Sequence, residues 1–260
     1  MKQRIITAII GIIIVLPIIL YGSWPFMLAV YFLATVALYE MVRMFKITNF
    51  FYFFISTLFL WTFIYSQQSV TDGFFSFSLM NLVIIYMVLL LLFMVFSKNK
   101  FSFDDASRLM LASLFIGFAF HYMIEVRSIG LHVFLFILFA IWATDSGAYF
   151  IGKKFGKRKL WPDISPNKTI GGAVGGILFS IILAIIFHLI FPFDQSIISI
   201  SVIAIVISVF GQLGDLVASA IKRKYSVKDF GHIFPGHGGV LDRLDSFMFV
   251  LITLQIIQYF

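Results

Sequence analysis

The sequence predicts an all-α integral membrane protein, a polytopic bundle of about nine transmembrane helices with a cytoplasmic N-terminus and the C-terminus outside. Hydrophobic residues make up 61% of the chain and charged residues only 12%, against roughly 25% charged residues in soluble domains. Apolar runs of about 20 residues, enough to cross a bilayer, recur from end to end. Basic residues gather in alternate connections between these runs. Together these observations exclude a soluble globule.

The first apolar run, 5–21, follows Met1-Lys2-Gln3-Arg4 and at first sight resembles a signal peptide. It is long, contains Pro17 and lacks a small-x-small cleavage pattern, so we interpret it as a retained first helix. Hydropathy places the remaining spans near 24–42, 50–66, 79–97, 107–124, 131–151, 172–191, 196–214 and 244–260.

The distribution of basic residues tests this arrangement. With the N-terminus inside, 18 of the 19 Lys and Arg residues fall on the cytoplasmic side, and only Arg127 falls outside. Cytoplasmic loops carry such an excess, and one miscounted span would invert every later loop. We therefore attribute the net charge of +7 to the basic cytoplasmic loops of a protein in the cell membrane. A nucleic acid partner is not expected.

Polar content divides the chain into two parts. Residues 1–130 hold about five helices that we expect to form a scaffold facing lipid, whereas 131–260 hold the remaining helices and two long inner loops, 152–171 and 215–243. Both loops are charged and rich in glycine. Such loops carry function more often than packing, so we expect catalysis there, facing the cytoplasm.

Two aspartates, Asp145 and Asp215, lie near the cytoplasmic ends of predicted spans. Ionisable groups at that depth are costly and need partners. They either contact a metal or substrate, or are interfacial carboxylates paired with a loop lysine. The chain has no cysteine, so any metal must be held by oxygen or imidazole, and Mg²⁺ is the natural candidate.

The second inner loop, with its flanks 219–245, combines carboxylates, basic residues, histidines and glycines. Carboxylates hold Mg²⁺, cations neutralise phosphate, and glycine lets backbone N–H groups approach an anion. Asp242 and Asp245 are three residues apart and would share a helix face. They are a pair around a cation, or alternatively a helix cap and a salt bridge with Arg243.

The first inner loop is not a phosphate-binding P-loop, because Gly152 and Gly156 are too close and no Ser or Thr follows Lys157. We attribute Lys153 to Lys159 to topology and attraction to anionic lipids. Ser165-Pro-Asn-Lys-Thr169 is expected to form a rigid turn whose hydroxyl, amide and ammonium groups offer a phosphate site before the next helix.

Glycines and lone histidines are given structural roles. Gly171, Gly172, Gly175 and Gly176 form small-x-x-x-small pairs, which predict close helix packing. The histidines that stand singly in or near apolar segments are treated as structural, namely His121, His132 and His188.

The stretch 219–245 resembles the signature of the phosphatidate cytidylyltransferase family of bacterial type, also called CDP-diacylglycerol synthases. Every specified position is filled, by Ser219, Ile221, Lys222, Arg223, Lys228, Asp229, Gly231, Phe234, Pro235, His237, Gly238, Gly239, Val240, Asp242, Arg243, Leu244 and Asp245. The resemblance extends upstream to Asp145-Ser-Gly-Ala-Tyr149 and to Ser165-Pro-x-Lys-Thr169. Two positions depart from the family, where Gly171 replaces a common Glu and Asn167 a frequent Lys.

The resemblance implies transfer of a cytidylyl group from CTP to phosphatidic acid, giving CDP-diacylglycerol and pyrophosphate for phospholipid biosynthesis, with Mg²⁺, in a homodimer. It implies that Asp215 and Asp242 coordinate the metal. It further implies a catalytic role for Asp229 and phosphate binding by Lys222, Arg223, Lys228 and Arg243. The substrates would contact Asp145, Ser165, Asn167, Lys168, Thr169, Ser219, Asp245 and a triphosphate loop of His237, Gly238 and Gly239.

Two other functions remain open. A CTP-dependent lipid kinase of the dolichol or phytol type resembles this family but transfers the γ-phosphoryl group, and the complete signature favours nucleotidyl transfer. A transporter of anionic lipids would place its ionisable sites near the bilayer midplane, often in repeated halves. Here the charges gather at one face, which favours the enzyme.

Overall fold

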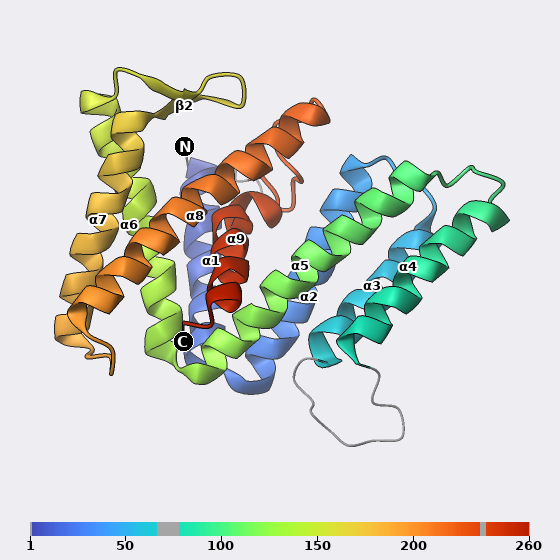
Figure 1. The fold of residues 1–260 in the computed structure, drawn as a ribbon, viewed down its shortest axis with the longest axis horizontal. Coiled ribbons are helices and arrows are strands. Elements are labelled where there is room, and N and C mark those ends of the chain that lie inside the picture. The colour runs from blue at the N-terminus through green and yellow to red at the C-terminus, as the bar shows by residue number, and fades with distance from the viewer. Residues whose placement is uncertain (1, 67–77, 235–237, 260) are drawn as a thin grey trace. The chain divides into compact units, whose positions relative to one another are not determined.

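The computed structural model describes residues 2–66, 78–234 and 238–259, and in this part of the chain it has nine helices and one β-hairpin (Figure 1). The helices are α1 (Lys2–Tyr21), α2 (Ser23–Met44), α3 (Phe50–Ser66), α4 (Leu79–Phe96), α5 (Phe103–Ile129), α6 (Leu131–Phe155), α7 (Ile170–Ile190), α8 (Ile197–Lys224) and α9 (Leu241–Ile257). The hairpin pairs β1 (Lys159–Trp161) with β2 (Ser165–Thr169), antiparallel, between α6 and α7.

The helices follow the predicted spans in order. Six of them, α2 and α4 to α8, are long and apolar enough to cross a membrane, and α3 is a shorter apolar helix. The protein is therefore a multi-pass membrane protein with a helical fold.

Contacts along the backbone divide the chain into two compact units. Unit 1 comprises residues 1–124 together with 229–241, and unit 2 comprises 125–228 together with 242–260. The segment 229–241 belongs to unit 1, although it comes late in the sequence.

Several predicted helix ends are wrong. The eighth span was expected to stop at 214, but α8 continues to Lys224, so the first ten residues of the expected loop 215–243 are helical. No Gly or Pro interrupts 215–224, and basic residues in the last turn favour a helix C-terminus. Likewise α6 reaches Phe155, so Asp145 lies inside a helix rather than near its end.

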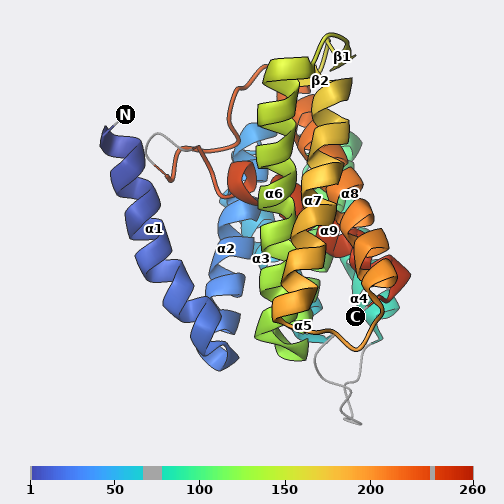
Figure 2. The same ribbon diagram turned by 90° about the vertical axis from the view of Figure 1, so that its left-hand side faces the viewer.

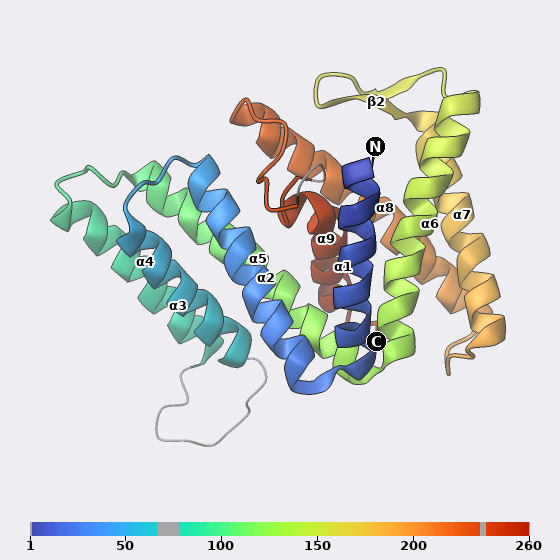
Figure 3. The same cartoon turned by 180° about the vertical axis from the view of Figure 1, so that it is seen from behind.

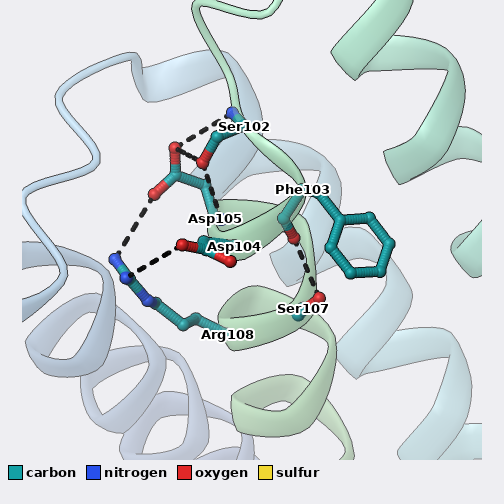
Figure 4. Close-up of polar contacts among 6 residues, drawn as sticks. All are labelled: Ser102, Phe103, Asp104, Asp105, Ser107 and Arg108. Carbon is teal, nitrogen blue, oxygen red and sulfur yellow. Dashed lines mark hydrogen bonds and ion pairs between the residues drawn. The ribbon is translucent and has the colours of Figure 1, made fainter.

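The start of α5, expected at 107, lies at Phe103 because of a capping box (Figure 4). The hydroxyl of Ser102 donates to Asp105 Oδ2 at 2.8 Å and accepts the N–H of Asp105 at 3.1 Å. The backbone N–H of Ser102 also donates to Asp105 Oδ2, at 3.1 Å. These bonds satisfy donors that a helix start otherwise leaves open, which adds a turn to the predicted span.

A buried hydroxyl cluster ties α3, α4 and α5 together in unit 1, where Figure 3 shows these helices running alongside α2. Tyr86 is 2% exposed, and its hydroxyl bonds Ser56 at 2.7 Å and Ser113 at 3.0 Å. Its ring stacks on Phe59, with centroids 4.0 Å apart. Because these hydroxyl groups are buried among apolar side chains, their bonds to one another help to fix how the three helices pack.

Close packing of α6 on α7 organises unit 2, and Figure 2 shows the two helices side by side below the hairpin. A Cβ added to Gly147 would lie 2.7 Å from the carbonyl oxygen of Gly175 and from Cβ of Phe179. One added to Gly176 would lie 2.9 Å from the carbonyl oxygen of Thr144. The predicted packing role of the α7 glycines is confirmed, and α8 packs against both helices of the pair.

Candidate active site

A hollow of about 560 Å³ lies in unit 2 between α6, the hairpin, the start of α7 and α8. Its lining includes several predicted site residues, namely Asp145, Asn167, Lys168, Thr169 and Asp215. Gln212, which sequence reasoning missed, lines it as well. The structure thus gathers residues from both predicted functional loops around one space.

An ion pair joins the hairpin to α8 in this hollow. Lys168 Nζ on β2 lies 2.5 Å from Asp215 Oδ2 and also donates to the carbonyl oxygen of Gln212 at 3.3 Å. The Gln212 amide donates to the carbonyl oxygen of Ala173 at 3.3 Å, which links α8 to α7. Because α8 extends to Lys224, Asp215 lies inside the helix, and helical hydrogen bonds hold the backbone of Asp215 on both sides.

A second ion pair joins α8 to α9. Lys222 Nζ donates to Asp242 Oδ1 at 2.8 Å, and the two side chains are only 14% and 4% exposed. Lys222 lies in the last turn of α8 and Asp242 in the first turn of α9, where the helix dipoles favour a cation and an anion respectively. A basic and an acidic predicted site residue therefore meet at two neighbouring helix ends.

The two ion pairs belong to one electrostatic group. The charge of Asp215 acts on both Asp145 and Asp245, and Asp245 is also influenced by Lys222 and Asp242. Close packing of α8 on α9 explains this proximity, because a Cβ on Gly214 would lie 3.1 Å from the carbonyl oxygen of Asp245. Four carboxylates and two ammonium groups thus form one connected set of charges within the unit.

The segment Ser165–Thr169 is a β-strand, not the rigid turn that was predicted. Pairing with β1 extends it, and Thr169 then caps α7 by accepting the N–H of Gly172 at 3.1 Å. The strand exposes Asn167 and directs Lys168 to Asp215, while Thr169 is 8% exposed. The hydroxyl of Thr169 thus has a structural role in the described conformation.

The remaining predicted site residues lie on several elements. Ser219 follows Asp215 by four residues on α8, and Arg223, Lys228 and Arg243 are exposed. Asp229, Gly238 and Gly239 belong to the segment of unit 1, and His237 lies outside the described residues.

A buried glutamate that sequence reasoning missed holds this segment. Glu40 on α2 is 2% exposed, and its carboxylate accepts the N–H of Val240 at 2.9 Å and of Leu241 at 3.0 Å. The available signal was an acidic residue inside a predicted span, which is costly without partners.

Comparison with known proteins assigns the chain to a family. The sequence model of the family described as "Cytidylyltransferase family" matches residues 2–260. The chain belongs to the cytidylyltransferase family. It is 46% identical over 255 residues, 96% of this chain and 95% of the relative, to a protein of Bacillus subtilis (strain 168) named "Phosphatidate cytidylyltransferase".

Proteins with the same name from staphylococci are similar to this cytidylyltransferase over almost its whole length. That of Staphylococcus haemolyticus is 44% identical over 262 residues, and that of Staphylococcus aureus (strain COL) 41% over 262 residues. Both alignments cover 99% of this chain and 98% of the relative. The similarity therefore extends over both halves of the chain.

The carboxylates of this cytidylyltransferase have the donor chemistry that Mg²⁺ prefers. Mg²⁺ is usually held by one or two carboxylates together with substrate phosphates, and keeps several waters. Among the described residues no group of three acidic or histidine side chains is close enough to hold a metal by itself. Asp215 and Asp242 each face a lysine instead. The donor set therefore fits a cation that arrives with phosphates.

The position where the family commonly has Glu has a packing explanation here. A Cβ added to Gly171 would lie 3.3 Å from the carbonyl oxygen of Phe155 and 3.4 Å from Cα of Gly156. The contact with the carbonyl oxygen of Phe155 is tighter than most, so a side chain at 171 requires the end of α6 to shift by a few tenths of an ångström. Glycine at 171 lets α7 start close against that end.

Proposed function

We propose that this member of the family transfers the cytidylyl group of CTP to phosphatidic acid, giving CDP-diacylglycerol and pyrophosphate. The observation that carries the proposal is the 46% identity over nearly the full length with a protein named phosphatidate cytidylyltransferase. The geometry agrees with it, because acidic and basic side chains converge beside a hollow in a membrane protein.

The reaction needs no nucleophile from the protein. A phosphate oxygen of phosphatidic acid attacks the α-phosphorus of CTP, a new P–O bond forms, and the bond from the α-phosphorus to the bridging oxygen breaks. Pyrophosphate leaves with that electron pair. Both reactants are anionic, so catalysis consists of positioning them and neutralising their charge.

Exchange of ion-pair partners would prepare the site. In the described conformation Lys168 is paired with Asp215 and Lys222 with Asp242. Substrate phosphates bind the two lysines in place of the carboxylates, so that Asp215 and Asp242 no longer pair with Lys168 and Lys222. Asp215 and Asp242 would then hold Mg²⁺, with Asp245 beside them, and the ion supplies further neutralisation of phosphate charge when bound.

The proposal places the enzyme in the cytoplasmic membrane with its active site facing the cytoplasm, as a homodimer. Its support for orientation is that 18 of the 19 basic residues lie in or beside the N-terminus and the alternate connections between helices. Two of those connections, 45–49 and 97–102, line one hollow in unit 1, so they lie at the same end of that unit. Support for the homodimer is the family resemblance alone.

Label transfer tests the reaction. Purified protein in detergent is given phosphatidic acid, Mg²⁺ and CTP labelled at either the α- or the γ-phosphorus. Cytidylyl transfer predicts α-label in the lipid, release of pyrophosphate and loss of both on chelation of the metal. Label from the γ-position would identify a lipid kinase, and transfer of neither label would contradict both enzymatic readings.

A further inference from the structure

Glu40 is a buried carboxylate whose two oxygens bind one short stretch of backbone. Oε1 accepts the N–H of Val240 at 2.9 Å and Oε2 accepts that of Leu241 at 3.0 Å. The two sides of this contact are 200 and 201 residues apart in sequence, yet both belong to unit 1. The contact therefore fixes the late segment 229–241 on the scaffold helix α2.

Two glycines of the segment make room for this carboxylate. A Cβ added to Gly231 or to Gly239 would collide with Oε1 of Glu40, and both glycines are buried. Gly239 directly precedes Val240, so a side chain there would displace the acceptor from its donors. The absence of side chains at these two glycines lets their backbone approach the carboxylate of Glu40 on α2.

The donors are the open N–H groups at the start of α9. A helix start leaves its first N–H groups without intrahelical partners, and a nearby Ser, Thr, Asp or Asn normally accepts from them. Here a residue from a distant helix does so. A carboxylate offers two acceptors, whereas a glutamine offers one acceptor and an NH₂ group that would face a second donor. The arrangement therefore requires Glu and not Gln.

We propose that Glu40 is a positioning residue for nucleotidyl transfer. It sets the backbone of Gly238, Gly239, Val240 and Leu241, the residues that directly precede Asp242 in the chain, so that this backbone is held in the conformation that reacts. Gly238 itself has a positive φ of 85°, and its carbonyl accepts the N–H of Phe234 at 3.0 Å, so this backbone is closely specified. The inference rests on the proposed cytidylyl transfer.

The test compares turnover per folded molecule with fold stability. Full-length Glu40→Gln is assayed in detergent with CTP, phosphatidic acid and Mg²⁺, well below its melting temperature. We expect kcat to fall about ten-fold or more, because a buried donor then faces another donor. Tyr86→Phe is the matched control, since it removes a buried hydrogen-bonding group of unit 1 far along the sequence from the segment. It should lower the melting temperature and leave kcat per folded molecule unchanged.

A double variant tests the contact itself. Gly239→Ala should reproduce the loss of kcat, because its Cβ collides with the carboxylate. Adding Glu40→Asp withdraws the carboxylate by one methylene and should restore part of that loss. A double variant that is as impaired as the two single effects combined would contradict the coupling. If Glu40→Gln does not fold, this pair carries the test.

Hydrogen exchange separates the two proposals. Loss of protection at 238–242 in Glu40→Gln, measured by mass spectrometry, reports the contact whether or not the protein turns over. A wild type that exchanges normally but transfers no cytidylyl group overturns the proposed function and not the contact. A wild type that is active, with Glu40→Gln retaining normal kcat, overturns the positioning role.

Discussion

At the scale of single residues, the site consists of charges that already have partners. Lys168 faces Asp215, and Lys222 faces Asp242 in a pair that is almost fully buried. Replacing both members of a buried ion pair by apolar groups often costs little stability. Removing only one member leaves a buried charge unpaired and is costly. The presence of a buried pair at Lys222 and Asp242 fits a role in handling phosphate and metal, which requires charges that can change partner.

Variants of the Lys222–Asp242 pair separate that role from stability. We expect Asp242→Asn to lower kcat by about 100-fold or more, because a carboxylate that neutralises the reacting charge is lost. It should also cost roughly 2 kcal/mol of stability, since Lys222 loses a charged hydrogen-bond partner. Chemical denaturation and steady-state kinetics on the purified protein measure the two effects.

The double variant Lys222→Met/Asp242→Asn provides the control for this pair. It should recover most of the stability and none of the activity, since the apolar stem of Met replaces the buried ammonium group. Normal Mg²⁺-dependent turnover in Asp242→Asn would contradict the role of Asp242.

Lys168 offers a test of phosphate binding. Lys168→Met removes the ammonium group that lines the hollow and should raise KM for at least one substrate about ten-fold or more. Lys154→Met is the control, because Lys154 is exposed at the end of α6 and was attributed to topology. Equal kinetics of the two variants would show that the charge at Lys168 has no specific function.

At the scale of elements, hydropathy predicted which segments are helical but not where they end. It detects apolar residues, whereas α8 continues through the polar stretch 215–224 and α5 begins with the capping box of Ser102. That box was readable in the sequence, because Ser-x-x-Asp before an apolar run is a helix-start pattern. The β-hairpin gave no comparable signal, because its strands are only three and five residues long and the longer one is polar.

Contacts between distant segments could not be predicted. The signature residues were found because they lie together in sequence, whereas Glu40 contacts a segment 200 residues away. A single sequence indicates that a buried acid needs a partner, but not which one. The pairing of Lys168 with Asp215 was likewise open, since a loop lysine was expected without its number.

Packing of α6 on α7 supports the hollow and is testable with one methyl group. Gly147→Ala places a Cβ 2.7 Å from the carbonyl oxygen of Gly175, so the helices must move apart. We expect a loss of about 1–3 kcal/mol in stability, typical of overpacking. Gly11→Ala is the control, because a Cβ there meets no described atom within 4 Å. It should be neutral or slightly stabilising in thermal unfolding, and equal melting temperatures for both variants would contradict close packing at Gly147.

At the scale of the whole molecule, the basic residues and the proposed site predict the same orientation of the protein in the membrane. CTP is a cytoplasmic nucleotide, and it can reach the site only if the hairpin and the end of α8 face the cytoplasm. The distribution of basic residues predicts the same orientation independently of any substrate. A measurement of orientation is therefore the most direct test of the predicted topology of the entire chain.

The absence of cysteine makes this orientation measurable, because each introduced thiol is the only one in the chain. Thr48, Asp163 and Asp194 are exposed and lie in the connections after α2, within the hairpin and after α7. In intact cells a membrane-impermeant maleimide should label Asp194→Cys. It should label Thr48→Cys and Asp163→Cys only after permeabilisation, since an active site facing the cytoplasm requires the hairpin inside. The cysteine-free parent gives the background signal. Labelling of Asp163→Cys in intact cells would show that the hairpin lies outside, where cytoplasmic CTP cannot reach the site.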